Sequence, residues 1–240
     1  MPLSRREVLA LPFSGAIGSA TERVWTLEAM EAFLANAPIV REKSLGIGIT
    51  CPLKLTLRRE DIEKSAHFQS VDESKLVHRT ETVHETNFRD TWRYNVAAYR
   101  LDRMLGLQMT PPSVERVHGG RRGAITWWIE DAMMEVDRLR KRIEPPDVED
   151  FNAQMQIVRV FDQLIFNTDR NLQNLLIDPL WRLWMIDHTR AFRWHSQLRS
   201  ARNLERCERR LLAGLRGLNE KGLRAAMGSM LDRQCITGLL

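Results

Sequence analysis

The sequence predicts an α+β fold of two lobes, in which a strand-rich first half precedes a mainly helical second half. Two observations carry this prediction. Apolar residues alternate with polar ones in LGIGITCPLKLTL (45–57), whereas in FNAQMQIVRVFDQLIF (151–166) they recur at helical spacing. Two such lobes leave a cleft between them, where ligands commonly bind. A chain of 240 residues is long enough for this arrangement.

The strand-rich half begins with a helix. WTLEAMEAFLANA (25–37) has apolar residues at helical spacing, and Thr21 or Thr26 provides a capping side chain. Two strands are expected on either side of the Cys-Pro pair that follows, and residues 65–72 form another short strand. Residues 73–89 are polar and show no period, so we expect a loop there.

A second helix and a hairpin complete this half. We expect Asp90 to cap a helix over TWRYNVAAYRLDRMLGL (91–107), whose apolar residues form one stripe, and Gly106 to end it. Two short β runs flank the Gly-Gly pair at 119–120 and predict a β-hairpin. Residues 25–130 are therefore assigned to an N-lobe.

The second half, residues 131–240, is assigned to a mainly helical C-lobe. DAMMEVDRLRKRI (131–143) predicts a helix stopped by a Pro-Pro pair, and the helix over 151–166 follows it. NLLID and LWMID read as short strands around a turn. A strong amphipathic pattern over 202–218 predicts a last helix.

The bulk composition is that of an ordinary globular protein, with 43% hydrophobic and 28% charged residues. No apolar run approaches the roughly 20 residues that a membrane span requires, so we expect no transmembrane segment. The net charge of +5 is mild, and acids are interleaved with the arginines of the last third. We therefore expect a solvated surface there and no nucleic-acid partner. Three widely separated cysteines without a CxxC pair argue against a zinc site or a disulfide framework.

Residues 1–24 have two interpretations. Arg5 and Arg6 precede an apolar stretch and then small residues, a layout that resembles a twin-arginine export signal. The alternative is a disordered start with two chance arginines, because Pro12 and Gly15 interrupt the apolar stretch. The expected location is therefore either the cytoplasm or outside it, by export through this route.

Two carboxylates and an amide form the candidate site. If residues 175–177 pair with 184–186 as a hairpin, Asn174 and Asp187 lie on the same rim. Two oxygen donors suit Mg²⁺, which keeps its other positions for water and phosphate. Asp169 lies nearby and can accept or orient a hydroxyl proton, which completes a minimum set for phosphoryl transfer. The alternative is a structural turn, in which Asp and Asn side chains bond to the local backbone.

The motifs DRNLQN (169–174) and WMIDHTRAF (184–192) resemble the catalytic and metal-binding loops of the atypical kinase superfamily. Its members include the phosphoinositide 3-/4-kinases, the HipA-type bacterial kinases and the secretory-pathway kinases. The wider chain, roughly residues 40 to 220, is similar to a group of bacterial proteins that share this kinase-like core. The resemblance implies a two-lobed protein-kinase-like fold with a small β-rich N-lobe and a mainly helical C-lobe.

The resemblance also implies roles for the loop residues. Asp169 is the expected catalytic base, and Asn174 and Asp187 are the expected ligands of a Mg²⁺ ion bound with ATP. The nucleotide is thus the expected partner, together with an unknown protein or small-molecule acceptor. No second metal motif competes with this assignment, since the histidines show no metal-ligand spacing.

Nucleotide contacts are expected from the first half. The LGIGIT turn, with Gly46 and Gly48, resembles the loop over the nucleotide phosphates, although it lacks the GK[ST] of a Walker loop. The segment TWWI (126–129) resembles the strand that leads to the adenine-binding hinge. Trp128 is the candidate contact there, with core packing as the alternative for at least one of the two tryptophans.

Two positions depart from the kinase pattern. Kinases place a lysine on the third strand and an acid on the following helix, and the lysine contacts the α- and β-phosphates. The corresponding residues are Gln69 and Asn95, so both charges are missing together. This is chemically consistent because a lone buried charge would be uncompensated, but an amide cannot neutralise phosphate.

Two hypotheses about function follow. In the first, Lys54, Arg58, Lys64 or Arg170 replaces the missing lysine, and the protein is an ATP- and Mg²⁺-dependent phosphotransferase. Nucleotidyl transfer is a variant of this hypothesis, because ATP can bind in an inverted pose. In the second, the protein is a catalytically inactive pseudokinase or a nucleotide-binding regulatory module. The intact loop residues favour the first, since metal ligands serve little purpose without phosphate.

Overall fold

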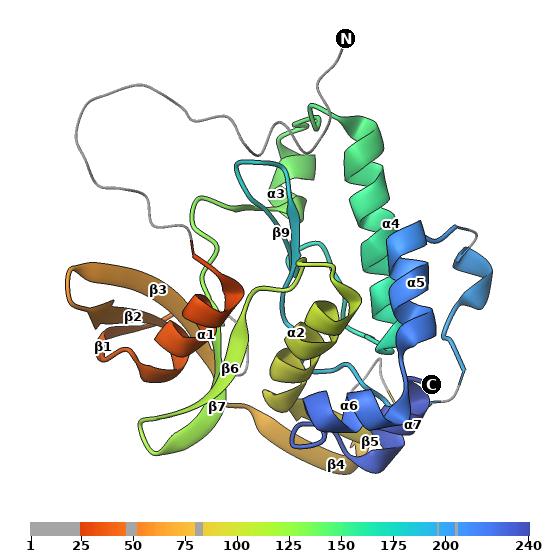
Figure 1. Ribbon diagram of the computed structural model, residues 1–240, viewed down its shortest axis with the longest axis horizontal. Helices are drawn as coiled ribbons and strands as arrows, with labels where there is room; N and C mark the ends of the chain where they lie inside the picture. Colours follow the sequence, from red (N-terminus) through yellow and green to blue (C-terminus); the bar gives the residue numbers. More distant parts are fainter. Residues whose placement is uncertain (1–24, 47–51, 80–83, 196, 205) are drawn as a thin grey trace.

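The protein has the α+β organisation in two parts that the sequence predicts, with a β-rich part and a larger, mainly helical part (Figure 1). The computed structural model describes residues 25–46, 52–79, 84–195, 197–204 and 206–240. Arg5, Arg6 and Gly48 lie outside the described residues, so their expected roles stay predictions.

The β-rich part is built on one antiparallel sheet covered on one face by helix α1 (Leu27–Asn36). Thr26 caps this helix, because its hydroxyl accepts a hydrogen bond from the backbone of Ala29. Strand β1, largely exposed at the sheet edge, was not expected from the sequence because it buries no alternating apolar set. In sheet order, the strands are β1 (Ile39–Ser44), β2 (Leu53–Arg59), β3 (Ile62–Gln69), β7 (Arg121–Trp127) and β6 (Ser113–His118).

The two faces of this sheet differ in polarity. Directly paired residues on antiparallel strands point to the same side, so the register assigns each side chain to a face. The face under α1 is apolar and at most 1% exposed, and it carries Leu55, Leu57, Ala66, Phe68 and Ile125. The opposite face is polar, with Lys54, His67 and Thr126 side by side and Gln69 beyond them. The predicted hairpin around residues 119–120 is confirmed as β6–β7.

The expected loop at 73–89 is wrong. Strands β4 (Asp72–Arg79) and β5 (His84–Thr91) pair there as an antiparallel ribbon. Leu76 and Val77 are neighbours in β4 and are 84% and 48% exposed, so neither face of that strand is fully buried and no apolar alternation marks it. Cross-strand pairing, which needs no apolar period, defines these strands.

Helix α2 (Arg93–Leu105) confirms the predicted helix and its end, since Gly106 adopts a left-handed conformation with φ of 69°. Its first residues differ from the prediction. Trp92 is the N-cap, and Asp90 belongs to β5, where its carboxylate pairs with Arg190 instead of capping the helix. A charge partner far along the chain outweighed the local capping preference of Asp90.

The mainly helical part has shorter helices than the sequence predicts. The expected helix over 131–143 is reduced to α3 because the two residues before it pair with β9. The expected helix over 202–218 begins only at Arg209, where the Glu208 side chain accepts a hydrogen bond from Leu211 N and caps it. The elements are β8 (Met133–Met134), α3 (Glu135–Arg140), α4 (Val148–Leu164), β9 (Leu175–Ile177), β10 (Leu183–Met185), a 3-10 turn (Ala201–Asn203), α5 (Arg209–Gly217), α6 (Glu220–Met227) and α7 (Arg233–Gly238).

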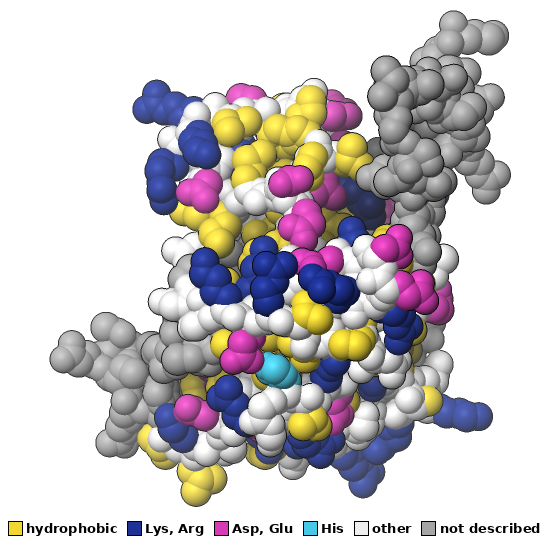
Figure 2. Space-filling model, turned by 90° about the vertical axis from the view of Figure 1, so that its left-hand side faces the viewer, with side chains coloured by type: hydrophobic (Ala, Val, Ile, Leu, Met, Phe, Trp, Pro, Cys, Tyr) yellow, Lys and Arg dark blue, Asp and Glu magenta, His cyan; other side chains and the backbone are white. Residues whose placement is uncertain are grey.

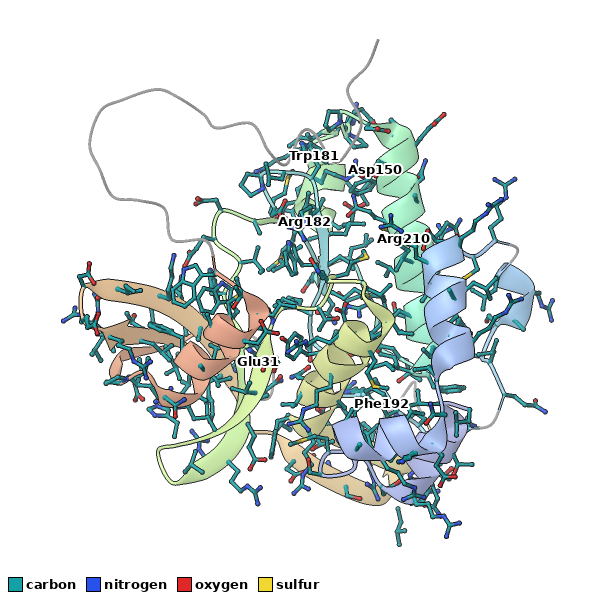
Figure 3. The ribbon with its side chains drawn as sticks, viewed as in Figure 1. Glu31, Asp150, Trp181, Arg182, Phe192 and Arg210 are labelled. Carbon is teal, nitrogen blue, oxygen red and sulfur yellow. The ribbon has the colours of Figure 1, made fainter. Side chains whose placement is uncertain are left out.

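Two hydrophobic cores hold these elements, a small one under α1 and a large one between α2 and the later helices. Ion pairs join α1 to α2, because Glu31 accepts hydrogen bonds from Tyr99 at 2.6 Å and Arg103 at 2.5 Å. Figure 3 shows Glu31 at this junction. Helix α2 therefore connects both cores, and the expected lobe boundary near residue 130 stays a prediction.

The surface carries charges of both signs. On the face shown in Figure 2, acidic and basic side chains are interspersed rather than separated. Within the described ranges, the search for a helix long and apolar enough to cross a bilayer finds none.

We predict that Asp102→Ala lowers the free energy of unfolding by about 2–4 kcal/mol. The buried Asp102 carboxylate accepts hydrogen bonds from the backbone N–H groups of Gln108, Met109 and Thr110, at 2.8–2.9 Å, and the substitution leaves these donors without their acceptor. Urea denaturation measures the change. The control Glu220→Ala removes only an exposed ion pair within a helix and is expected to cost under about 0.5 kcal/mol. Equal losses in both variants would contradict the assignment.

Candidate functional site

The loop after α4 is held by a buried acid. Asp162, in the last turns of α4, accepts a hydrogen bond from the Asn167 amide at 3.0 Å. The Asn167 side-chain oxygen in turn accepts one from the backbone N–H of Asp169 at 3.0 Å. These two bonds set the start of the loop, and the Asp169 side chain remains 44% exposed.

Arg170 joins this loop to the next one. Its guanidinium pairs with Asp162 at 2.9 and 3.1 Å and donates to the backbone carbonyls of Asn174 at 2.5 Å and Ile186 at 2.8 Å. It also donates to His188 Nε2 at 3.0 Å, so this ring nitrogen must be the unprotonated acceptor. Burial, reinforced by the Arg170 charge, places the pKa of His188 well below its usual range. His188 is thus a packed neutral side chain.

The predicted hairpin of β9 and β10 is confirmed, although β10 covers 183–185 and not the expected 184–186. It brings the segment of Asn174 beside the segment of Asp187. Met185 pairs with Leu175, and the N–H of Ile186 donates to the carbonyl of Asn174 at 3.1 Å. The Asn174 amide nitrogen donates to the carbonyl of Asp169 at 3.2 Å. The three predicted site residues therefore lie on adjoining backbone segments.

Asp187 occupies a strained and poorly hydrated position. Its φ of 55° lies in the left-handed region, which is sparsely populated by residues other than glycine. Burial raises the pKa of its carboxyl group, and the nearby charges of Asp90 and Asp169 raise it further, against a hydrogen bond from Thr189 at 3.2 Å. A carboxylate in these surroundings gains strongly from a nearby cation.

These donors fit Mg²⁺ in their chemistry. Among the described side chains, the only hydrogen bond made by the Asn174 side chain is donated by its nitrogen, so its oxygen is available as a ligand. Asp187 bonds one oxygen to Thr189. The described part of the chain has no group of three His, Cys, Asp or Glu side chains that could hold a metal. One amide and one carboxylate match the few protein ligands that Mg²⁺ takes when phosphate and water complete its shell.

Asp90 and Arg190 are site residues that sequence reasoning missed. Arg190 Nε donates to Asp90 Oδ2 at 3.1 Å, and Arg190 Nη1 lies 3.8 Å from Asp169 Oδ2. The sequence separates the first pair by a hundred positions, and no local pattern joins them. The sequence signals were the position of Arg190 three residues after Asp187 and the position of Asp90 before the predicted helix, where it is expected as a cap.

Gln69 and Asn95, the two residues expected at the positions of the kinase lysine and acid, contact each other. Asn95 Nδ2 donates to Gln69 Oε1 at 2.9 Å, and Asn95 Oδ1 accepts from the backbone N–H of His188 at 2.7 Å. Both amide side chains are buried. A neutral hydrogen-bonded chain therefore links β3, α2 and the loop of Asp187.

The remaining predicted nucleotide residues lie on or beside the small sheet. Gly46 has a left-handed φ of 61° and ends the described part of its loop. Trp127 packs against Trp25 and Phe33 in the small core, as expected for one of the two tryptophans. Trp128 is half-buried, and the Lys54 ammonium lies 4.0 Å from its ring centroid.

The four expected replacements for the missing lysine are not equivalent. Arg170 is committed to Asp162 and the two loop carbonyls, and exposed Arg58 pairs with Glu63. Lys64 pairs in register with the buried Leu57 and so belongs to the face covered by α1. Lys54 and Arg58 both belong to the polar face with Gln69, but of these two only Lys54 has no acidic partner among the described residues.

No family model matches this sequence, and no curated protein matches it either. Solved structures do resemble it. The structure of hydra Fam20 with sugar has a TM-score of 0.61 at 13% identity, over 93% of this chain and 86% of that one. The Golgi casein kinase has a TM-score of 0.59 at 13% identity, over 89% and 71% of the two chains. The Helicobacter pylori proinflammatory kinase CtkA has a TM-score of 0.52 at 9% identity, over 86% and 90%.

The chain therefore has a two-lobed, atypical-kinase-like fold. At these identities the likeness establishes the fold alone. The roles of the loop residues, and the resemblance to phosphoinositide kinases, HipA-type kinases and a bacterial group, stay predictions.

We predict that Asn95→Ala lowers the free energy of unfolding by about 2–3 kcal/mol, because it removes two buried hydrogen bonds. A double-mutant cycle with Gln69→Ala should give a coupling energy of about 1 kcal/mol. Denaturant titration measures both. Asn36→Ala is the control, since Asn36 is exposed and its side-chain bond among the described residues is to the carbonyl of Ala32 in its own helix. Strict additivity would argue against the amide chain.

Proposed function

We propose that this protein is an ATP- and Mg²⁺-dependent phosphotransferase that acts on a hydroxyl group of an acceptor. One observation carries the proposal: Asp169, Asn174 and Asp187 come together through backbone and side-chain bonds in a kinase-like fold. Nucleotide and metal are further supported by one of the similar solved structures, the Golgi casein kinase, which has Mn and ADP bound. The acceptor is a protein or a small molecule.

Each loop residue has a part in the proposed reaction. Bound Mg²⁺ supplies positive charge to the phosphates. Asn174 and Asp187 hold it through side-chain oxygens. The half-exposed Asp169 carboxylate orients the acceptor hydroxyl and takes its proton as the oxygen attacks phosphorus. Arg170 bonds both Asp162 and the carbonyl of Ile186, and so holds the loop of Asp169 beside the loop of Asp187. This keeps the proposed base close to the proposed metal ligands.

A second candidate function is a nucleotide-binding regulator without transfer activity. The observation that favours it is the Gln69–Asn95 hydrogen bond, because two amides occupy the places of a lysine and an acid and contribute no charge to phosphate binding. The two candidates differ in one measurable step. A regulator binds Mg·ATP but releases no ADP from it.

We predict that Mg·ATP at about 100 times its dissociation constant raises the free energy of unfolding by about 2.7 kcal/mol. Asp187→Ala and Asn174→Ala should remove most of this gain, whereas Asp169→Ala should keep binding and lose ADP release. Thermal unfolding and an ADP assay with candidate hydroxyl acceptors test this. Gln173→Ala changes an exposed side chain of the same loop and is the control. No stabilisation of the unaltered protein by millimolar Mg·ATP would contradict the proposal.

Lys54 is expected to replace the strand lysine at the α- and β-phosphates. Lys54→Met should therefore weaken Mg·ATP and Mg·ADP alike by about tenfold, the effect of one charge-assisted hydrogen bond. Lys64→Met is a closely matched control, because it removes a lysine from the adjacent strand of the same sheet on the opposite face. Titration calorimetry gives the Mg·ATP and Mg·ADP affinities of the unaltered protein and of each variant. Equal effects of the two substitutions would rule out this role of Lys54.

A further inference from the structure

Arg190 lies where the proposed reaction requires positive charge. Its Nη1 is 3.8 Å from Asp169 Oδ2, while its Nε is bonded to Asp90 Oδ2 at 3.1 Å. The contact to Asp169 is too long for a hydrogen bond, so it leaves the terminal nitrogens able to donate elsewhere. About a third of the side chain, 34%, is exposed. The guanidinium is thus anchored on one edge and accessible on another.

Asp90 and Phe88 hold the Arg190 guanidinium in place. The Asp90 side chain is only 8% exposed, and within the described residues Arg190 is its one hydrogen-bond partner. The other oxygen, Oδ1, is buried and has no hydrogen-bond partner in the part of the chain that the structure describes. Phe88 adds a contact, with its ring centroid 5.3 Å from the Arg190 guanidinium carbon. A buried carboxylate with so few partners depends on Arg190 for its stabilisation.

Three acids surround this arginine. Burial by itself would lower the pKa of Arg190. The hydrogen bond to Asp90 and the charges of Asp90, Asp169 and Asp187 outweigh burial, so its pKa is raised and it stays charged. Arg190 is therefore a fixed cation at the anionic site, in addition to the metal that the proposed function requires.

Geometry then limits what Arg190 can contact. A general base lies within hydrogen-bond reach of the hydroxyl that it deprotonates. That hydroxyl oxygen must approach the phosphorus that it attacks, so a long side chain about 4 Å from the Asp169 carboxylate is within reach of the transferred phosphoryl group. The fork of an arginine matches phosphoryl oxygens better than a point charge does.

We propose that Arg190 binds the γ-phosphoryl group of ATP during transfer and that Asp90 is its positioning residue. This inference rests on the proposed function and adds a catalytic residue to it. The bond from the γ-phosphorus to the ADP oxygen breaks, and ADP leaves with that electron pair. The acceptor oxygen forms the new bond to phosphorus, and its proton passes to Asp169. Arg190 donates to the phosphoryl oxygens throughout, where charge is concentrated.

The test compares ATP with ADP, because only ATP carries the γ-phosphoryl group. Arg190→Met should weaken Mg·ATP about tenfold or more and leave Mg·ADP unchanged, as measured by titration calorimetry. Arg190→Lys should recover part of the loss. Arg89→Met is a matched control: Arg89 is 35% exposed, lies 3.1 Å from Asp232 and stacks on Trp194 at 4.9 Å. It should change neither affinity, and unfolding without nucleotide confirms that each variant folds.

Asp90 is tested through Arg190. Asp90→Asn should lower the ratio of ATP to ADP affinity in the unaltered protein and have no further effect on that ratio in the Arg190→Met background. An independent structural role would lower it in both backgrounds. Suppose that the unaltered protein binds both nucleotides. If Arg190→Met then weakens the binding of both equally, or weakens the binding of neither, the inference fails and the proposed function stands. If the unaltered protein binds neither nucleotide, both fail.

Discussion

The buried ion pair between Arg170 and Asp162 is the interaction on which the site depends. One guanidinium bonds the end of α4, the carbonyl before β9, the carbonyl after β10 and the ring of His188. The two side chains are 13% and 10% exposed, so loss of either partner leaves a buried charge and typically costs about 3–5 kcal/mol. The positions of Asp169, Asn174 and Asp187 all follow from these bonds.

A second, neutral network attaches the small sheet to this centre. The chain from Gln69 through Asn95 to the backbone of His188 crosses from β3 to the loop of Asp187 without a formal charge. The charged side chains near the site lie outside this neutral chain. Lys54 lies against Trp128, and Arg190 is held by Asp90. The buried link from β3 to the loop of Asp187 therefore needs only amide hydrogen bonds, and the two cations lie outside it.

Sequence patterns predicted those parts of the fold in which burial follows a local period. The stripe of α2, the hairpin β6–β7 and the pairing of β9 with β10 were all predicted this way. The β4–β5 ribbon was missed because both faces of β4 remain exposed at Leu76 and Val77, so no apolar period marks it. The helix expected over 202–218 was too long, since amphipathic spacing does not show where a side chain such as Glu208 interrupts and caps.

The sequence by itself determined the two-lobed α+β class and the loop motifs with Asp169, Asn174 and Asp187. Only the tertiary structure decided that the Gln69 and Asn95 amides bond to each other, that Arg170 is a structural cation, and that Asp90 and Arg190 join the site. The physical reason is the sequence separation between the residues that make contact. Periodicity and spacing in a sequence report contacts between residues a few positions apart. Ion pairs form between residues that are close in the folded chain, however far apart they lie in the sequence.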